Sequence, residues 1–267
     1  MTKTIPSPAK DFLWLHMRDL PYFRALLRAV ESSYYEDFEL PVPILDVGCG
    51  DGHFASVTFD HPIDVGIDPW RGPIRKAMQY ELYDLLIEGD AGQMPFPDNH
   101  FSSGLSNSVL EHIPHVEQVL AETGRVLKPG AHFVFCVPNH TFMSKLSIGN
   151  FFDRLGLVFL GNLYRAFFTR ISRHVHCDSP QVWQTRLESA GFQLEDWWHY
   201  FSPRALHALE WGHYFGLPSL IIHAVTRRWN IAPFRWNFAL VDKLIRRYTD
   251  ASRNPDGAYT FFVARKV

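Results

Sequence analysis

Apolar positions follow two alternating patterns through the first 140 residues. Short segments at residues 44–47, 63–67, 85–88, 101–106 and 132–137 predict strands, and the first of them has the composition of a buried strand. Between these segments, apolar residues at helical spacing predict helices over residues 21–35, 74–83 and 115–127. Strands that alternate with helices in this way predict an α/β fold built on a Rossmann-like, doubly wound parallel sheet.

The alternation stops near residue 140. Residues 142–173 are aromatic, basic and weakly helical, and they carry no strand pattern. Ser179 and Pro180 then provide an N-cap and a first-turn proline for a new helix. The remaining predicted elements are a sixth strand at 192–200, a helical insertion over about 205–250 and a closing strand at 258–264.

These patterns divide the chain into a core and the segments that surround it. The expected parts are an N-terminal helical cover (1–40), a Rossmann-like core (41–140), a basic and aromatic helical insertion (141–178), a core helix with strand 6 (179–204), a second helical insertion (205–255) and strand 7 (256–267).

The overall composition is that of an ordinary globular protein, but the two halves of the chain differ in charge and in aromatic content. With 46% hydrophobic and 20% charged residues, the sequence excludes disorder, collagen and coiled coil. The net charge of −2 is a sum of −9 over residues 1–140 and +7 over residues 141–267. Residues 142–248 hold 21 of the 40 aromatic residues. Two differently specialised regions are therefore expected.

Cysteine usage and the apolar runs favour a cytoplasmic protein. The three cysteines are too few and too far apart for a disulfide framework or a metal cluster. Charged residues interrupt the apolar run near the N-terminus, so we expect no signal peptide. The uncharged stretch at 211–226 has 16 residues and is too short for a membrane span.

A glycine loop follows the first predicted strand. Gly48, Gly50 and Gly52 permit a sharp turn and a close approach of the backbone to a ligand. The spacing matches neither a dinucleotide fingerprint, which requires glycine where His53 stands, nor a P-loop. Because Asp46 precedes the loop, we expect a ligand that carries an amino group and positive charge.

Two further carboxylates end neighbouring strands. Asp68 is placed to accept hydrogen bonds from ribose hydroxyls, as in nucleotide-binding α/β folds, and the alternative is an N-cap for the helix that follows. Asp90 is placed to accept the exocyclic amine of adenine, and its alternative is a turn residue before Gly92.

Taken together, the motifs resemble those of class I S-adenosylmethionine-dependent methyltransferases of the type 11 group. The matching pieces run in family order: Asp46-Val47-Gly48-Cys49-Gly50-Asp51-Gly52, Gly66-Ile67-Asp68, Gly89-Asp90-Ala91, Ser106-Asn107-Ser108-Val109-Leu110-Glu111-His112 and Arg125-Val126-Leu127-Lys128-Pro129-Gly130. The resemblance covers residues 44–139. It implies a seven-stranded sheet whose last strand is antiparallel, and S-adenosyl-L-methionine as the cofactor.

The resemblance also implies which residues contact the cofactor. The expected contacts are Asp46, Gly48, Cys49, Gly50 and Gly52 of the loop, Asp68 with Pro69 at the ribose, Asp90 and Ala91 at the adenine, and Asn107 near the methionine part. Trp70 is placed to pack on the adenine face, with packing in the core as its alternative. The fourth strand reads Phe101-Ser102 where the family has Phe-Asp, a departure remote from the cofactor.

Histidines supply the candidate catalytic and acceptor-binding groups. His112 follows the fourth strand at its carboxyl end, where it is placed for contact with the acceptor or for proton transfer; the alternative is a structural role in its turn. Asn139, His140 and His176 are candidates for the acceptor pocket. His174 and His176 also permit a metal interpretation, but the sequence fixes no third ligand, and we predict no metal.

The two insertions are expected to select the acceptor. Residues 141–173 carry five Lys and Arg against one acidic residue, and residues 205–248 carry six against two. The helical pattern over 235–248 places Leu240, Val241, Leu244, Ile245 and Tyr248 on one face. The insertions either pack on the core with a solvated basic face or dock on an anionic membrane as peripheral elements.

The sequence therefore predicts an enzyme that methylates a small or lipid-linked acceptor, most simply at oxygen. A second hypothesis is a cofactor-binding scaffold without catalysis. Nucleic acid is disfavoured as a partner because no RNA-binding module accompanies the basic and aromatic residues.

Overall fold

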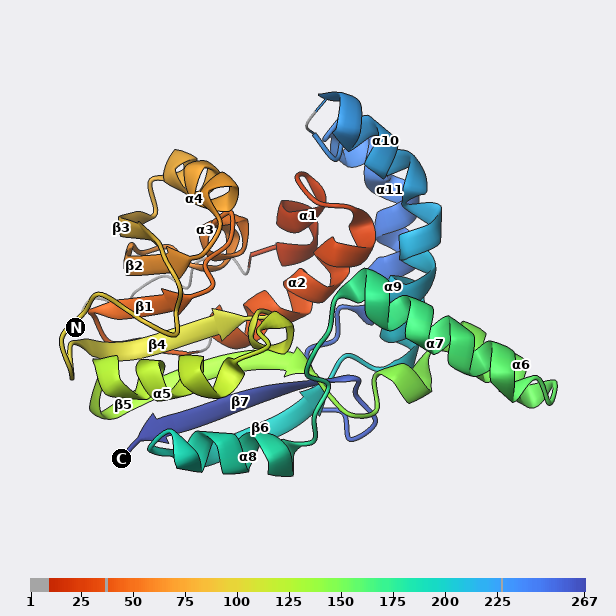
Figure 1. Ribbon diagram of the computed structural model, residues 1–267. Coiled ribbons are helices and arrows are strands. Elements are labelled where there is room, and N and C mark those ends of the chain that lie inside the picture. Colours follow the sequence, from red (N-terminus) through yellow and green to blue (C-terminus); the bar gives the residue numbers. More distant parts are fainter. Residues whose placement is uncertain (1–9, 37, 227) are drawn as a thin grey trace, which may run out of the picture.

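One seven-stranded sheet organises the molecule (Figure 1). The computed structural model describes residues 10–36, 38–226 and 228–267. The strands are β1 (Ile44–Val47), β2 (Ile63–Asp68), β3 (Tyr83–Glu88), β4 (Phe101–Asn107), β5 (Leu127–Pro138), β6 (Phe192–Tyr200) and β7 (Tyr259–Lys266).

Strand order confirms the predicted doubly wound sheet. The order is β3-β2-β1-β4-β5-β7-β6, and β1 to β5 run parallel. The last strand, β7, inserts antiparallel between β5 and β6. The chain winds outward in opposite directions from β1 and β4, and a crevice forms at such a switch point beyond the carboxyl ends of the strands.

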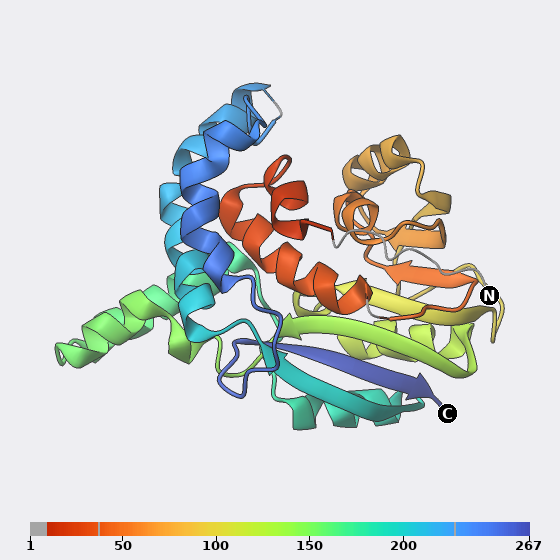
Figure 2. The ribbon, with the colours of Figure 1, turned by 180° about the vertical axis from the view of Figure 1, so that it is seen from behind.

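Helices cover both faces of the sheet (Figures 1 and 2). They are α1 (Phe12–Met17), α2 (Tyr22–Glu36), α3 (His53–Thr58), α4 (Arg71–Ala77), α5 (Val116–Val126), α6 (Ser147–Arg154), α7 (Val158–Ser172), α8 (Pro180–Ser189), α9 (Pro203–Phe215), α10 (Leu217–Thr226) and α11 (Arg235–Ile245). One hydrophobic cluster joins α1, α2 and α3 to one face of the sheet, and a second joins α5 and α8 to the other.

Two predicted boundaries are wrong. The helix predicted over 74–83 is α4, which begins at Arg71, and a 3₁₀ turn ends it before Glu81, whose φ of 51° is left-handed. Tyr83 consequently begins β3. The fifth strand, predicted over 132–137, begins earlier, because the chain becomes extended at Leu127 immediately after α5.

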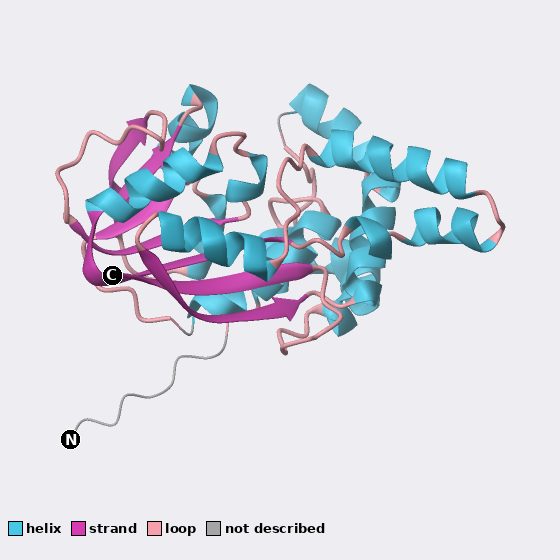
Figure 3. Ribbon diagram, turned by 60° about the horizontal axis from the view of Figure 1, so that its bottom comes forward, coloured by secondary structure: helices cyan, strands magenta, loops and turns pink. Residues whose placement is uncertain are grey.

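The insertions form a helical hairpin and a group of three helices beyond the ends of the strands. In the first, α6 and α7 form a hairpin that projects away from the sheet, visible in Figure 3 as well. Arg165 holds the pair together by donating to Asn150 Oδ1 at 2.9 Å and pairing with Asp153. In the second, α9 packs on α2 while Arg246, just after α11, pairs with Asp11 at 3.0 Å.

The packing of α5 against the end of α8 is tight enough to test. Gly124 lies in α5, where an added Cβ would stand 2.3 Å from the Ala190 carbonyl oxygen. We expect Gly124→Ala to lower the free energy of unfolding by about 1–3 kcal/mol, the usual cost of overpacking. Urea denaturation measures this change.

Gly72→Ala is the matched control, because a Cβ at this helical position meets no atom within 4 Å. We expect it to change stability by less than about 1 kcal/mol, and in the stabilising direction. Equal stabilities for the two variants would contradict the observed contact between α5 and the end of α8.

Candidate functional site

A cavity of about 820 Å³ opens at the switch point of the sheet. It is lined by all but one of the predicted cofactor residues: Asp46, Gly48, Cys49, Gly50, Asp68, Pro69, Trp70, Asp90, Ala91 and Asn107. The candidate catalytic residue His112 lines the same cavity. The structure thus brings together side chains that lie in or just after four different strands, β1 to β4.

The glycine loop needs glycine for conformation as well as for ligand access. Gly48, Gly50 and Gly52 all have left-handed φ values, of 78°, 57° and 72°. A Cβ at Gly48 would stand 2.3 Å from Val109 Cγ1, and one at Gly52 would stand 3.0 Å from Ala77. Gly52 is the predicted cofactor residue that does not line the cavity; it precedes α3 as its N-cap.

Asp46 is a buried carboxyl that forms part of the cavity wall. It is 4% exposed, and the Tyr83 hydroxyl donates to its Oδ2 at 2.7 Å. Burial raises the pKa of Asp46 to about 7; the hydrogen bond from Tyr83 opposes this shift, and the charge of Asp68 adds to it. The group is therefore poised to ionise when a cation approaches.

Asp68 is held in place by the backbone. Its Oδ2 accepts from Gly50 N at 3.1 Å and its Oδ1 accepts from Trp70 N at 2.9 Å. A carboxylate has about four acceptor sites, so two remain for hydroxyl donors. The N-cap alternative fails because α4 begins at Arg71 with Trp70 as its N-cap.

Asp90 and Trp70 lie at the more exposed end of the cavity. Asp90 accepts from Gly92 N at 2.8 Å, which is the turn interaction of its alternative interpretation, and this bond lowers the pKa of Asp90. His115 Nε2 also lies 3.4 Å from Asp90 Oδ1, the oxygen that Gly92 N bonds, so Oδ2 keeps its acceptor capacity. Trp70 is 70% exposed, which excludes packing in the core and leaves its indole at the cavity.

Asn107 is engaged by a buried network that sequence reasoning missed. Its Nδ2 donates to Glu31 Oε2 at 3.0 Å, and Cys136 Sγ donates to its Oδ1 at 3.0 Å. Glu31 is fully buried in α2 and pairs with Arg28 at 2.7 Å. Arg24 and Arg28 line the cavity. The sequence does contain a sign of this network, because the spacing of Arg24, Arg28 and Glu31 places all three on one face of a helix.

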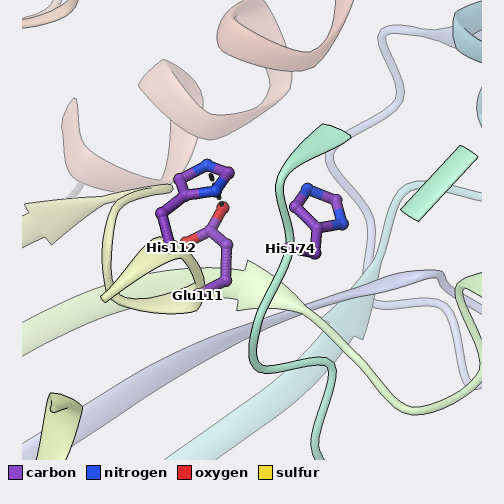
Figure 4. Close-up of side chains that lie close together, drawn as sticks. All are labelled: Glu111, His112 and His174. Carbon is purple, nitrogen blue, oxygen red and sulfur yellow. Dashed lines mark ion pairs between the residues drawn. The ribbon is translucent and has the colours of Figure 1, made fainter. Parts of the chain in front are cut away.

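His112 belongs to a cluster with Glu111 and His174 (Figure 4). Its Nε2 lies 3.6 Å from Glu111 Oε1, and its ring centroid lies 5.3 Å from that of His174. Burial lowers the pKa of His112 and lowers that of His174 to about 3, while burial raises the pKa of Glu111 to about 8. Both imidazoles are therefore neutral at pH 7.

The three other pocket candidates do not line this cavity. Asn139 is fully buried, and its Nδ2 donates to Gly257 O at 2.9 Å, which ties the end of β5 to the loop before β7. His140 is exposed on the same side, with its ring near His199. His176 turns away from His174 and bonds Ile113 O at 3.0 Å.

At the N-terminus, helix packing accounts for Trp14. Its ring packs against Phe238, and the Arg235 guanidinium lies 4.8 Å from its centroid. Of the N-terminal helical cover expected over 1–40, the residues that line the cavity are Leu20, Arg24 and Arg28, and Trp14 is not among them.

Comparison with known proteins identifies a methyltransferase domain within the chain. A family profile described as a methyltransferase domain matches residues 45–135. The sterol 24-C-methyltransferase erg6 of Aspergillus fumigatus is 33% identical over 125 residues, which is 42% of this chain and 32% of that protein. The fatty-acid O-methyltransferase of Mycolicibacterium smegmatis is 33% identical over 97 residues, 34% of this chain and 35% of that protein.

Similarity at the level of structure extends further along the chain. A crystal structure from Thermotoga maritima, described as a methyltransferase and possible histamine N-methyltransferase, covers 96% of this chain and is itself covered to 93%. Its TM-score is 0.53 at 15% identity, which shows a shared fold. The chain spans only 25–52% of the length of several curated relatives. Residues 45–135 therefore match a methyltransferase domain, within a fold that the chain shares with a solved methyltransferase structure.

Proposed function

We propose that this protein transfers the methyl group of S-adenosylmethionine to an oxygen of a lipid-like acceptor. One observation carries the proposal: the three cofactor carboxylates and His112 line a single cavity. Asp46 and Asp68 form a cofactor wall of the cavity beside the glycine loop. Leu20, His112 and Ile113 form an acceptor wall, which offers apolar groups and an imidazole. Cofactor and acceptor thus have separate walls of one space.

The residues on the cofactor wall divide the ligand between them. Asp68 accepts the ribose hydroxyls, Asp90 and Ala91 contact the adenine, and Trp70 covers its face. Asp46 faces the cationic methionine part. These residues fit the cofactor. The pKa of the buried Asp46 carboxyl is about 7, so the group ionises and gains a partner when the ammonium group of the cofactor enters the cavity.

The cofactor supplies a methyl group that a positive sulfur already activates, so the protein's main task is alignment and exclusion of water. His112 is oriented for contact with an acceptor hydroxyl or carboxyl. Its Nδ1 lies 3.0 Å from the Arg173 carbonyl, which can only accept, so Nδ1 carries the proton. Nε2 is then free to accept a hydrogen bond or a proton from the acceptor.

Exposed apolar side chains on the insertions support a lipid-like acceptor. On the α6–α7 hairpin they include Phe151, Leu155, Phe159 and Leu163, and on α10 and α11 they include Ile221, Val225, Trp236 and Leu240. Basic residues, including Arg154, Arg170 and Lys243, belong to the same helices or follow them directly. We infer that these helices dock on an anionic membrane surface.

This docking would be peripheral. None of the described helices has both the length and the apolar character needed to cross a bilayer. Of the helical face predicted over 235–248, Val241 and Ile245 turn toward the core, whereas Leu240 stays 71% exposed. Two relatives whose names concern sterols and fatty acids add to the case for a lipid acceptor.

Loss of the Asp68 carboxylate tests the cofactor site. We expect Asp68→Ala to weaken binding of S-adenosylmethionine by about 10- to 100-fold, because hydrogen bonds to a charged group contribute about 1.5–3 kcal/mol. Isothermal calorimetry measures the affinity, and transfer of labelled methyl groups into lipid fractions measures turnover. Asp84→Ala, on exposed β3, is the control; equal affinity of both variants would reject the site.

Cofactor binding should also depend on pH through Asp46. Its pKa of about 7 falls when a cation binds, so binding releases a proton and tightens as pH rises from 5.5 to 7, by up to about tenfold per pH unit. Calorimetry in buffers of different ionisation enthalpy counts the proton. Asp46→Asn should remove this dependence, and an unchanged pH profile in the variant would assign the proton elsewhere.

Co-sedimentation with vesicles tests membrane docking. We expect the protein to bind phosphatidylcholine vesicles containing phosphatidylserine more tightly than neutral ones, and Phe159→Asp with Ile221→Asp to reduce binding by about tenfold or more. These side chains are 77% and 70% exposed. Val267→Asp removes an equally exposed apolar group at the far end of the sheet and should have no effect. Indifference to lipid charge would contradict the proposal.

A further inference from the structure

Three potential metal ligands from two distant segments converge at the edge of the cavity. Glu111 and His112 belong to the 3₁₀ turn after β4, and His174 follows α7. One donor atom from each lies within 4.8 Å of the others (Figure 4). We propose that Glu111, His112 and His174 bind a divalent transition-metal ion of the Zn²⁺ class, with an open coordination position facing the acceptor.

The hydrogen-bond pattern leaves the right atoms available. Because Nδ1 of His112 donates to the Arg173 carbonyl, its Nε2 presents a lone pair. That lone pair faces Glu111 Oε1 across 3.6 Å, which is too long for a hydrogen bond. A metal-binding histidine commonly donates its other N–H to a backbone carbonyl, which is the arrangement seen here.

Glu111 has spare capacity as well. It is 1% exposed, and its Oε2 has no hydrogen-bond partner within the described part of the chain. A buried carboxyl oxygen that lacks a partner is costly, and a bound cation would offset that cost. The carboxyl and the two imidazoles thus form a set that accepts positive charge.

The backbone holds His174 beside the other two ligands. Val175 N and His176 N both donate to the Glu111 carbonyl, at 2.7 and 3.0 Å. Arg173, whose φ of 58° is left-handed, directs its own carbonyl to His112. These contacts join the two segments on both sides of His174, so the cluster does not depend on flexible side chains alone.

The donor set and its spacing select the ion. Two histidines and one carboxylate are typical of catalytic zinc sites and leave a position open for water or substrate. In a tetrahedral site, bonds of about 2.0–2.2 Å place two ligand atoms about 3.3–3.6 Å apart. Donors that lie within 4.8 Å of one another therefore have to approach by no more than about 1.5 Å, which rotation of their side chains can provide.

The position of the cluster suggests a role that rests on the proposed function. His112 lines the cavity beside Ile113 and Pro114, so an ion held by its Nε2 would border the acceptor wall. An ion there would hold the acceptor oxygen and favour loss of its proton to water. His112 Nε2 would then be a ligand rather than the group that takes the proton.

Metal binding can be tested without turnover. After treatment with a chelator, the full chain should bind one Zn²⁺ per molecule in equilibrium dialysis, and Co²⁺ should give the absorption bands of a four- or five-coordinate site. We expect His174→Gln and His112→Gln to weaken Zn²⁺ binding by more than about 100-fold, since loss of even a hydrogen-bond partner of a ligand costs about 10- to 100-fold.

His176→Gln is the matched control, because it lies two residues from His174, bonds Ile113 O and should keep the one-to-one stoichiometry. Thermal unfolding establishes that each variant is folded. Zn²⁺ binding by the parent no tighter than by folded His174→Gln would overturn the site. Asp68→Ala should retain the ion while losing cofactor affinity; retention of both would refute the proposed cofactor site and leave the metal site standing.

Discussion

The carboxylate of Glu31 is fully buried, and the geometry of the cavity depends on it. Four donors bind it: Arg28 from the same helix, Asn107 and Ser108 at the end of β4, and Tyr200 at the end of β6. Burial would lower the pKa of Arg28, yet the Glu31 carboxylate keeps it raised. Moving α2 away from either strand end would remove donors from the buried Glu31 carboxylate and leave its charge unpaired, which is costly. The four bonds therefore fix α2 against the ends of both strands.

This network explains why α2 forms one wall of the cavity. Leu26, Ala29 and Val30 anchor the helix in the core, while Arg28 turns toward the ligand space and also donates to Asn107 O. Apolar contacts have no preferred direction, whereas hydrogen bonds do. The bonds of Glu31 act together with those that Ser32 and Tyr35 make to Thr58 and to Ser106 O. They fix the rotation of the helix and with it the approach of Arg24 and Arg28 to the cofactor wall.

The sequence predicted those parts of the site that local chemistry determines. The glycine loop needs three left-handed residues after a buried strand, which glycine supplies. Asp68 and Asp90 lie at or just after the ends of predicted strands, so the sequence identified these residues individually. Glu31 escaped prediction because Asn107 lies 76 residues away from it in the sequence. His174 was considered as a metal ligand, but its partner Glu111 was missed because it lies 63 residues away. His174 and His176 alternate along the chain, but only the docked backbone reveals that they face different partners.

The two halves of the charge pattern meet at the turn between Asn107 and His112. Its first residue is bound by Glu31, and its last is bound by the Arg173 carbonyl at the end of the basic α6–α7 hairpin. The hairpin exposes Phe159 and Leu163 at its outer part, while its final residues dock on the cavity wall through Glu111 O. Any contact that reorients the hairpin therefore acts on the same short turn that positions His112. At this turn, hydrogen bonds to main-chain carbonyls couple the acidic, cofactor-binding half to the basic half, while ion pairs of Asp11 with Arg235 and Arg246 join the two halves elsewhere.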